Sequence, residues 1–143
     1  NSHVIPGLIY RFHEAKINNL PSITIWGTGT PKREFLHVED MARASIFIMG
    51  LDKKDYDKHT SSMCSHINVG SGKDLTIKEL AETIKKVTGY KGEINFDLTK
   101  PEGNIKKLLD SKKMNILGFK HQINLENGLK KTYEEYLKRN ANV

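Results

Sequence analysis

Residues 66–89 read HINVGSGKDLTIKELAETIKKVTG, and this stretch decides the fold class. Residues 66–69 predict a short apolar strand, which a glycine-rich turn ends. Thr76 and Glu79 have the spacing of a capping box that starts a helix, and Gly89 is the residue type that ends one. The helix carries its apolar side chains on one face, at Ile77, Leu80, Ala81, Ile84 and Val87. A strand followed by an amphipathic helix is typical of α/β proteins.

The same patterns place elements along the rest of the chain. Helices are expected over 2–16, where Ser2 can cap the start, over 39–51, from Asp110 or Ser111 to Leu117, and after Asn124. One face of the helix over 39–51 carries Met41, Ala44, Ser45, Ile48 and Met49. Strands are expected over 22–26 and 93–97, extended chain over 33–38, and a loop over 52–64. The order predicts an α/β fold.

The strand over 66–69 lies between two helices, so it belongs in a parallel sheet, whose strands are buried on both faces. This chain supplies too few neighbouring strands to bury it. We therefore expect residues upstream to complete the sheet. Asn1 in place of an initiating methionine also favours a processed chain or an excised fragment.

Composition limits the class of protein. The 143 residues, 37% of them apolar, suit one domain, 1–143. No run approaches the roughly 18 apolar residues of a membrane span, and no secretory signal follows Asn1, so no membrane association is expected. The single cysteine, Cys64, excludes an internal disulfide framework and favours a reducing, cytoplasmic compartment.

The net charge of +6 permits binding to nucleic acid or to an anionic ligand. The lysines fall in scattered pairs rather than in one block, which favours a solvated surface. Arginine is scarce, with Arg11, Arg33, Arg43 and Arg139 only. Each arginine is therefore a candidate for a specific role, because its planar fork and a lysine's point charge are not interchangeable.

Three short motifs lack residues that a dinucleotide, phosphate or metal site would need. Residues 27–29, GTG, lack the third glycine and the following helix of a dinucleotide fingerprint. Residues 70–73, GSGK, lack the first glycine and the Ser or Thr of a phosphate loop. Cys64 and His66 have no second ligand pair, so no metal site is expected.

Two stretches carry a family resemblance. Residues 1–15, NSHVIPGLIYRFHEA, and 25–41, IWGTGTPKREFLHVEDM, are similar to the carboxy-terminal part of the GDP-L-fucose synthase family, within the extended short-chain dehydrogenases/reductases. The similarity continues through HINVG (66–70), DLTIKEL (74–80), GYKG (89–92), KPEG (100–103), KLLD (107–110) and LENGL (125–129).

The resemblance implies a Rossmann-type enzyme whose amino-terminal core is mostly absent here. Such enzymes convert GDP-4-keto-6-deoxy-D-mannose to GDP-L-fucose by 3,5-epimerisation and NADPH-dependent 4-reduction, commonly as homodimers. The family's glycine-rich cofactor loop and catalytic Tyr-xxx-Lys lie upstream, and no Tyr-xxx-Lys occurs in this sequence. Residues 1–143 are thus expected to be a single substrate-binding domain, inactive alone, with NADP(H) bound mainly by the missing half.

Three residues match the family's basic site residues. His3 matches an acid/base histidine that also lies against the nicotinamide, a role that suits an imidazole; it could otherwise only cap or pack at a helix start. Arg33 matches the arginine that holds the diphosphate, and a guanidinium can grip phosphate bidentately; its alternative is pairing with Glu34 or Glu39. Arg11 matches a second substrate-binding arginine, about two helical turns after His3.

Three further residues are implied to bind substrate. Trp26 matches a tryptophan that contacts the substrate, although a core aromatic on a strand is equally compatible with the pattern. Lys107 matches a cation near the phosphates, with Lys106 as a neighbouring alternative. Glu102 stands where the family often has Asp, to accept hydrogen bonds from substrate hydroxyls. Asn68 and Asp40 are interpreted as structural.

Three other functions are compatible with the sequence. The first alternative is another nucleotide-sugar epimerase or dehydratase of the same superfamily. The second is a basic nucleic-acid-binding module, against which stand the dispersed lysines and the lack of aromatic residues between them. The third is a non-catalytic relic of the enzyme that serves only as a scaffold.

Overall fold

The computed structural model describes residues 3–141 of the chain. Its contacts group into two compact units: the first comprises 1–33, 75–106 and 126–143, and the second comprises 34–74 and 107–125. The prediction that residues 1–143 act as a single domain stays a prediction. No helix within the described range is long and apolar enough to cross a membrane.

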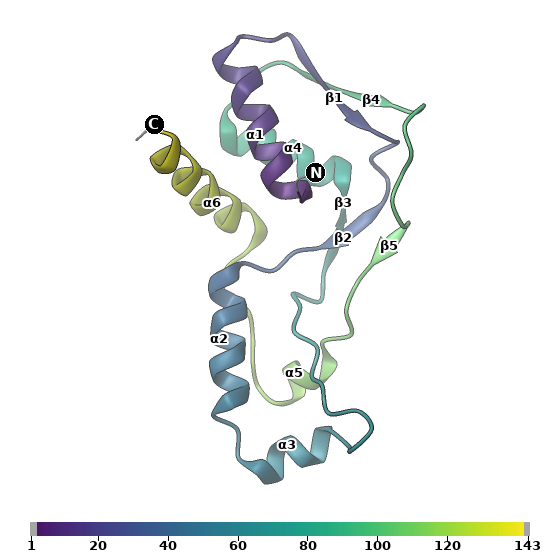
Figure 1. Ribbon diagram of the computed structural model, residues 1–143, viewed down its shortest axis with the longest axis vertical. Coiled ribbons are helices and arrows are strands. Elements are labelled where there is room, and N and C mark those ends of the chain that lie inside the picture. Colours follow the sequence, from purple (N-terminus) through teal and green to yellow (C-terminus); the bar gives the residue numbers. More distant parts are fainter. Residues whose placement is uncertain (1–2, 142–143) are drawn as a thin grey trace. The chain divides into compact units, whose positions relative to one another are not determined.

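The first unit is built on a parallel pair of strands (Figure 1). Strand β1 (Ser22–Trp26) pairs with β4 (Glu93–Asp97), with Ser22 opposite Glu93 and Trp26 opposite Asp97. Along β1, Ile23 and Ile25 are buried while Thr24 and Trp26 are exposed. This alternation follows from the two-residue period of a strand and leaves one face of β1 for the core.

Helices α1 (Val4–Ile17) and α4 (Ile77–Thr88) pack against each other, and α1 also contacts β1. Their buried residues are Leu8, Ile9, Phe12 and Ala15 of α1 and Leu80, Ala81, Ile84 and Thr88 of α4. The ring of Phe12 meets Tyr90 edge-on, with centroids 5.7 Å apart. Helix α6 (Leu125–Asn140) adds Leu129 and Tyr133 to the buried set. The apolar spacing seen in the sequence therefore marks the core of this unit.

The capping box of α4 forms as predicted. The Thr76 hydroxyl accepts the Glu79 N–H at 3.1 Å, and the Glu79 carboxylate accepts the Thr76 N–H at 2.7 Å. Gly89 ends the helix with a φ of 73°, in the left-handed region.

We expect Thr76→Ala to lower the free energy of unfolding by about 1 kcal/mol, measured by urea denaturation. Thr83→Ala is the control, because the Thr83 hydroxyl donates only to a carbonyl within α4; equal losses in both variants would contradict a capping role.

The second unit holds helices α2 (Val38–Met49), α3 (Lys53–His59) and α5 (Lys112–Ile116). The rings of Phe47 and Phe119 lie 5.6 Å apart between centroids. Asp40, at the start of α2, is fully buried. Its two carboxylate oxygens accept the backbone N–H groups of Gln122 and Ile123, each at 2.9 Å, and Arg43 donates to it. Asp40 therefore has the structural role that its sequence position suggested.

A three-stranded sheet has the order β3 (Asp74–Thr76), β2 (Lys32–Glu34), β5 (Lys106–Lys107). In the second unit, the Glu34 carboxylate accepts the N–H of Gly72 at 2.6 Å and that of Leu109 at 2.9 Å. Glu34 thereby links the turn after Gly70 to the segment after β5.

Several predicted elements are corrected. Residues 66–69 form no strand, and β3 lies instead at Asp74–Thr76. Helix α3 and an antiparallel bridge between Ser61 and Cys64 occupy part of the expected loop 52–64. The first helix starts after His3 as N-cap, and Ser2 lies outside the described residues. On the α2 face that the sequence predicted, Ala44 is buried, but Met41 and Met49 are exposed.

Candidate functional site

The carboxyl ends of β1 and β4 carry two irregular segments, 27–31 and 98–105. The Gly27 N–H donates to the Asp97 carbonyl at 2.9 Å and extends the ladder by one bond. The Asp97 carboxylate then accepts the N–H and hydroxyl of Thr99, at 3.0 and 2.6 Å, which turns the chain away. Ligands of open α/β sheets bind outside the carboxyl ends of the strands, so this edge is a candidate ligand-binding edge of the first unit.

Trp26 ends β1 on its outward side. It is 65% exposed, so it is not part of the core of the first unit. The ammonium group of Lys100 lies 5.8 Å from the centroid of the indole ring, within the range of a cation–π contact. Trp26 therefore offers a flat aromatic face and an indole N–H beside a positive charge.

Glu102 reaches back to the turn that follows Trp26. Its Oε1 accepts both the backbone N–H and the hydroxyl of Thr28. These two bonds, the hydroxyl one foremost, lower the pKa of Glu102 below its ordinary value. Gly27 makes room for this arrangement, because a Cβ there would lie 2.6 Å from the Glu102 Cγ, and its φ of 79° favours glycine.

Arg33 lies beside the same 98–105 segment. Its Nη1 donates to the carbonyls of Lys32 and Asn104, each at 2.7 Å. A Cβ at Gly103 would lie 2.8 Å from Nη2, so a side chain at position 103 would require the guanidinium to shift. The Glu34 carboxylate, one of the two pairing alternatives, instead accepts the N–H groups of Gly72 and Leu109. Both carbonyl acceptors are neutral, so these two bonds hold the guanidinium without neutralising its charge.

His3 and Arg11 both belong to the helix that packs on β1. His3 is the N-cap of α1, but its exposed side chain makes no capping bond. Arg11 is exposed and its Nη2 donates to the Thr24 carbonyl in β1. The structure thus places Arg11 against β1 and leaves the His3 side chain exposed at the start of α1.

Lys107 is the one predicted site residue in the second unit. It is exposed in β5, two positions before Leu109, whose N–H donates to Glu34. In the first unit, Trp26 ends β1, Glu102 bonds to Thr28 in the segment after β1, and Arg33 bonds to Asn104 in the segment after β4. For Lys107 the structure gives only the local setting, so the predicted phosphate contact stays a prediction.

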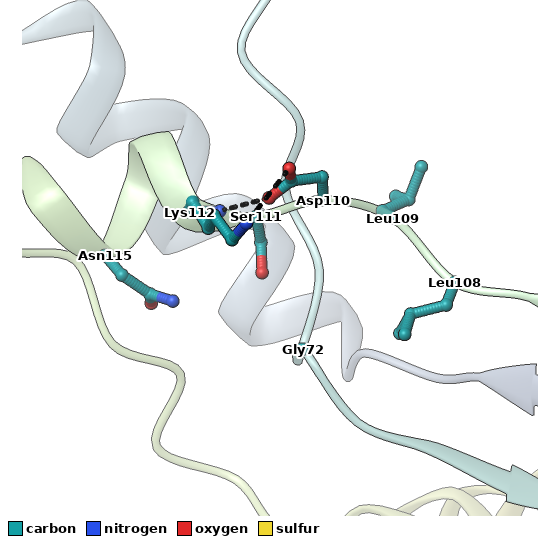
Figure 2. Close-up of a pocket in the computed structure, with 7 residues that line it drawn as sticks. All are labelled: Gly72, Leu108, Leu109, Asp110, Ser111, Lys112 and Asn115. Carbon is teal, nitrogen blue, oxygen red and sulfur yellow. Dashed lines mark hydrogen bonds and ion pairs between the residues drawn. The ribbon is translucent and has the colours of Figure 1, made fainter.

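A cavity in the second unit was not predicted (Figure 2). It has a volume of about 360 Å³ and is lined by Gly72, Leu108, Leu109, Asp110, Ser111, Lys112 and Asn115. The Asp110 carboxylate accepts the Lys112 N–H at 3.0 Å, and the Lys112 ammonium lies 4.0 Å from it. None of the predicted site residues lines this cavity. Within residues 3–141 there is also no group of three or more His, Cys, Asp or Glu side chains that could hold a metal ion.

Comparisons with known proteins identify the relatives. Residues 1–70 match the model of the NAD dependent epimerase/dehydratase family. A GDP-L-fucose synthase of Escherichia coli (strain K12) is 56% identical over 137 residues, which cover 96% of this chain and 43% of that protein. The chain is a homologue of the carboxy-terminal part of GDP-L-fucose synthases. The GDP-L-fucose synthase 1 of Arabidopsis thaliana agrees, at 46% identity over 99% of this chain and 41% of its own length.

The fold comparison supports the same family. The GDP-mannoheptose C4 reductase of Campylobacter jejuni, solved with NADP bound, superposes with a TM-score of 0.81 at 36% identity. The match covers 95% of this chain and 45% of the reductase. The predicted fold class, an α/β carboxy-terminal portion of an extended short-chain dehydrogenase/reductase, is confirmed. The nucleic-acid-binding alternative is not favoured, and the chain spans less than half the length of these relatives.

Proposed function

We propose that this chain forms the GDP-sugar-binding part of a GDP-L-fucose synthase. That enzyme converts GDP-4-keto-6-deoxy-D-mannose to GDP-L-fucose by 3,5-epimerisation and NADPH-dependent 4-reduction. The observation that supports the proposal is that Trp26 ends β1, Glu102 bonds to the segment after β1, and Arg33 bonds to the segment after β4. We further propose that residues 1–143 act as one substrate-binding domain, inactive in reduction alone, of a cytoplasmic homodimeric enzyme.

Each of the three residues suits one part of a nucleotide sugar. Two carbonyls hold the Arg33 guanidinium through Nη1, which leaves the N–H groups of Nη2 for a phosphate. Trp26 presents an exposed ring, on which a sugar or base can pack. Glu102 has a lowered pKa and is ionised at neutral pH, so it accepts hydrogen bonds from sugar hydroxyls. Arg11 adds positive charge for the diphosphate, and the phosphate contact of Lys107 is kept as a separate expectation for the second unit.

His3 is the proposed proton-transfer residue and the proposed contact to the cofactor. Epimerisation needs a proton moved at a carbon beside a ketone, and an imidazole can both accept and donate a proton near neutral pH. His3 fits, because its side chain is exposed and not used to cap α1. NADP(H), when bound, supplies the hydride for the 4-reduction.

Trp26 provides the test, because it is the chain's one tryptophan. We expect GDP-mannose and GDP to change the Trp26 fluorescence in a saturable way, with GDP-mannose binding more tightly. Trp26→Phe should abolish the optical signal while calorimetry still detects binding of GDP. A single-stranded oligonucleotide is the control ligand, and its binding should be weaker and should fall steeply with salt. Preference for the oligonucleotide, or no response to either GDP ligand, would overturn the proposal.

A further inference from the structure

We propose that Thr28 is a positioning residue that holds the Glu102 carboxylate toward the sugar, with Thr30 holding Thr28 in turn. This proposal rests on the proposed function, because it assigns Glu102 to the sugar. It adds a residue that the family resemblance does not assign, and it acts through Glu102 without touching substrate.

The hydrogen bonds give Thr28 a defined direction. Its hydroxyl oxygen accepts the Thr30 N–H at 3.2 Å and lies 2.7 Å from the Thr30 hydroxyl. Both the hydroxyl and the backbone N–H of Thr28 donate to the same oxygen of Glu102, Oε1. Because Thr30 supplies a donor to the Thr28 oxygen, the Thr28 proton is directed at Glu102. Residues 28, 30 and 102 thus form a short polar chain.

The backbone beneath this chain is shaped to accept the Glu102 side chain. A Cβ at Gly27 would lie 2.6 Å from the Glu102 Cγ and 2.7 Å from its Oε1. Any side chain at position 27 would therefore push Glu102 away from Thr28. The glycine at position 27 thus leaves the space that the Glu102 side chain fills when it bonds to Thr28.

Holding Glu102 matters because it is exposed and its side chain has several rotatable bonds. Without a partner, it would lose more conformational freedom when a sugar binds, and that loss weakens binding. The bonds to Thr28 already restrict the Glu102 side chain in the unliganded protein, so less conformational freedom is lost when a sugar binds. Since both of its donors bind one oxygen, the second oxygen, Oε2, can be directed to a sugar hydroxyl. The expected effect of Thr28 is thus on the sugar and not on the GDP.

The test compares Thr28→Val, which keeps the shape but loses the hydroxyl, with Thr28→Ser, which keeps it. For Thr28→Val we expect affinity for GDP-mannose to fall about 3–10-fold, with affinity for GDP unchanged, and Thr28→Ser to restore it. Carboxyl NMR titration should show a higher pKa for Glu102 in Thr28→Val than in the wild type. The matched control is Thr83→Val, whose hydroxyl bonds only within α4; it should change none of these.

The outcomes separate the two proposals. An unchanged Glu102 pKa in folded Thr28→Val, or no rescue by serine, overturns the role of Thr28 whatever binds. Equal losses for GDP and GDP-mannose also overturn it, because they indicate general damage to the site. Failure of the wild type to bind either GDP ligand refutes the proposed function, while the Glu102 titration still decides whether Thr28 holds the carboxylate.

Discussion

Asp40→Asn should lower the free energy of unfolding by about 3 kcal/mol. Asp40 is fully buried at the start of α2, and each of its oxygens accepts a backbone N–H at 2.9 Å, from Gln122 and from Ile123. Asparagine has one acceptor oxygen, so its amide group would face one of these N–H donors. It would also leave Arg43 without its carboxylate partner. Breaking a buried ion pair from one side costs more than losing a neutral hydrogen bond.

Urea denaturation measures this loss, and Asp52→Asn is the matched control. Asp52 is the exposed N-cap of α3 and makes no capping bond, so its change should cost little. A loss for Asp40→Asn no larger than that of the control would contradict the role assigned to Asp40. Such a result would mean that water satisfies the N–H groups of residues 122 and 123.

The same carboxylate makes stability depend on pH. Burial raises the pKa of Asp40, but the N–H groups of Gln122 and Ile123 and the charges of Arg43 and His121 lower it more, so the net shift is downward. A carboxyl with a folded pKa below its unfolded value of about 3.9 contributes stability above that value and loses it as pH falls through the folded pKa. We expect the wild type to lose stability below about pH 4 more steeply than Asp40→Asn. Parallel urea curves from pH 6 to pH 2 check this, and identical slopes would contradict it.

The elements predicted correctly have signals within a few residues. Helix α4 has its capping box, its apolar face and its terminal glycine within 76–89. Strands β1 and β4 have short runs rich in β-branched or apolar residues. Helix α3 was missed because it buries no residue and has no apolar period. Its local support is ionic, from Lys53 to Asp57 at 2.6 Å and from Lys58 to Asp55 at 3.0 Å.

Residues 66–69 were predicted to form a strand, but they form none. The segment is apolar, but a strand requires a neighbour for its N–H and C=O groups, and apolar composition does not specify one. In the structure the first unit takes its parallel pairing from β1 and β4, which are separated by α4 and much of the chain. Pairing over such a distance is a tertiary property that a local pattern does not contain.

The site was predicted through the family resemblance, and its supporting contacts were not. Thr28 meets Glu102 across 74 positions of the chain, and Arg33 meets the Asn104 carbonyl across 71. Neither pair has a spacing rule, because loops and not one helix or strand bring them together. The one local signal was glycine: Gly27 and Gly103 stand where a Cβ would strike Glu102 and Arg33.

Arg33→Ala should weaken binding of GDP by about 30-fold, or roughly 2 kcal/mol. The guanidinium is already fixed by the carbonyls of Lys32 and Asn104, so little freedom is lost when Nη2 meets a phosphate. Alanine removes both the charge and the donors. Trp26 fluorescence and calorimetry, with GDP as ligand, measure the change.

Two further variants separate the charge of Arg33 from its shape. Arg33→Lys keeps the charge but loses the planar fork, so we expect an intermediate loss of GDP affinity. Arg139→Ala removes an exposed charge near the end of α6 and should leave affinity nearly unchanged at moderate salt. If Arg139→Ala weakens binding as much as Arg33→Ala, the diphosphate responds only to net charge, and Arg33 has no specific role. If lysine restores full affinity, a point charge is sufficient and the bidentate grip on the diphosphate is excluded.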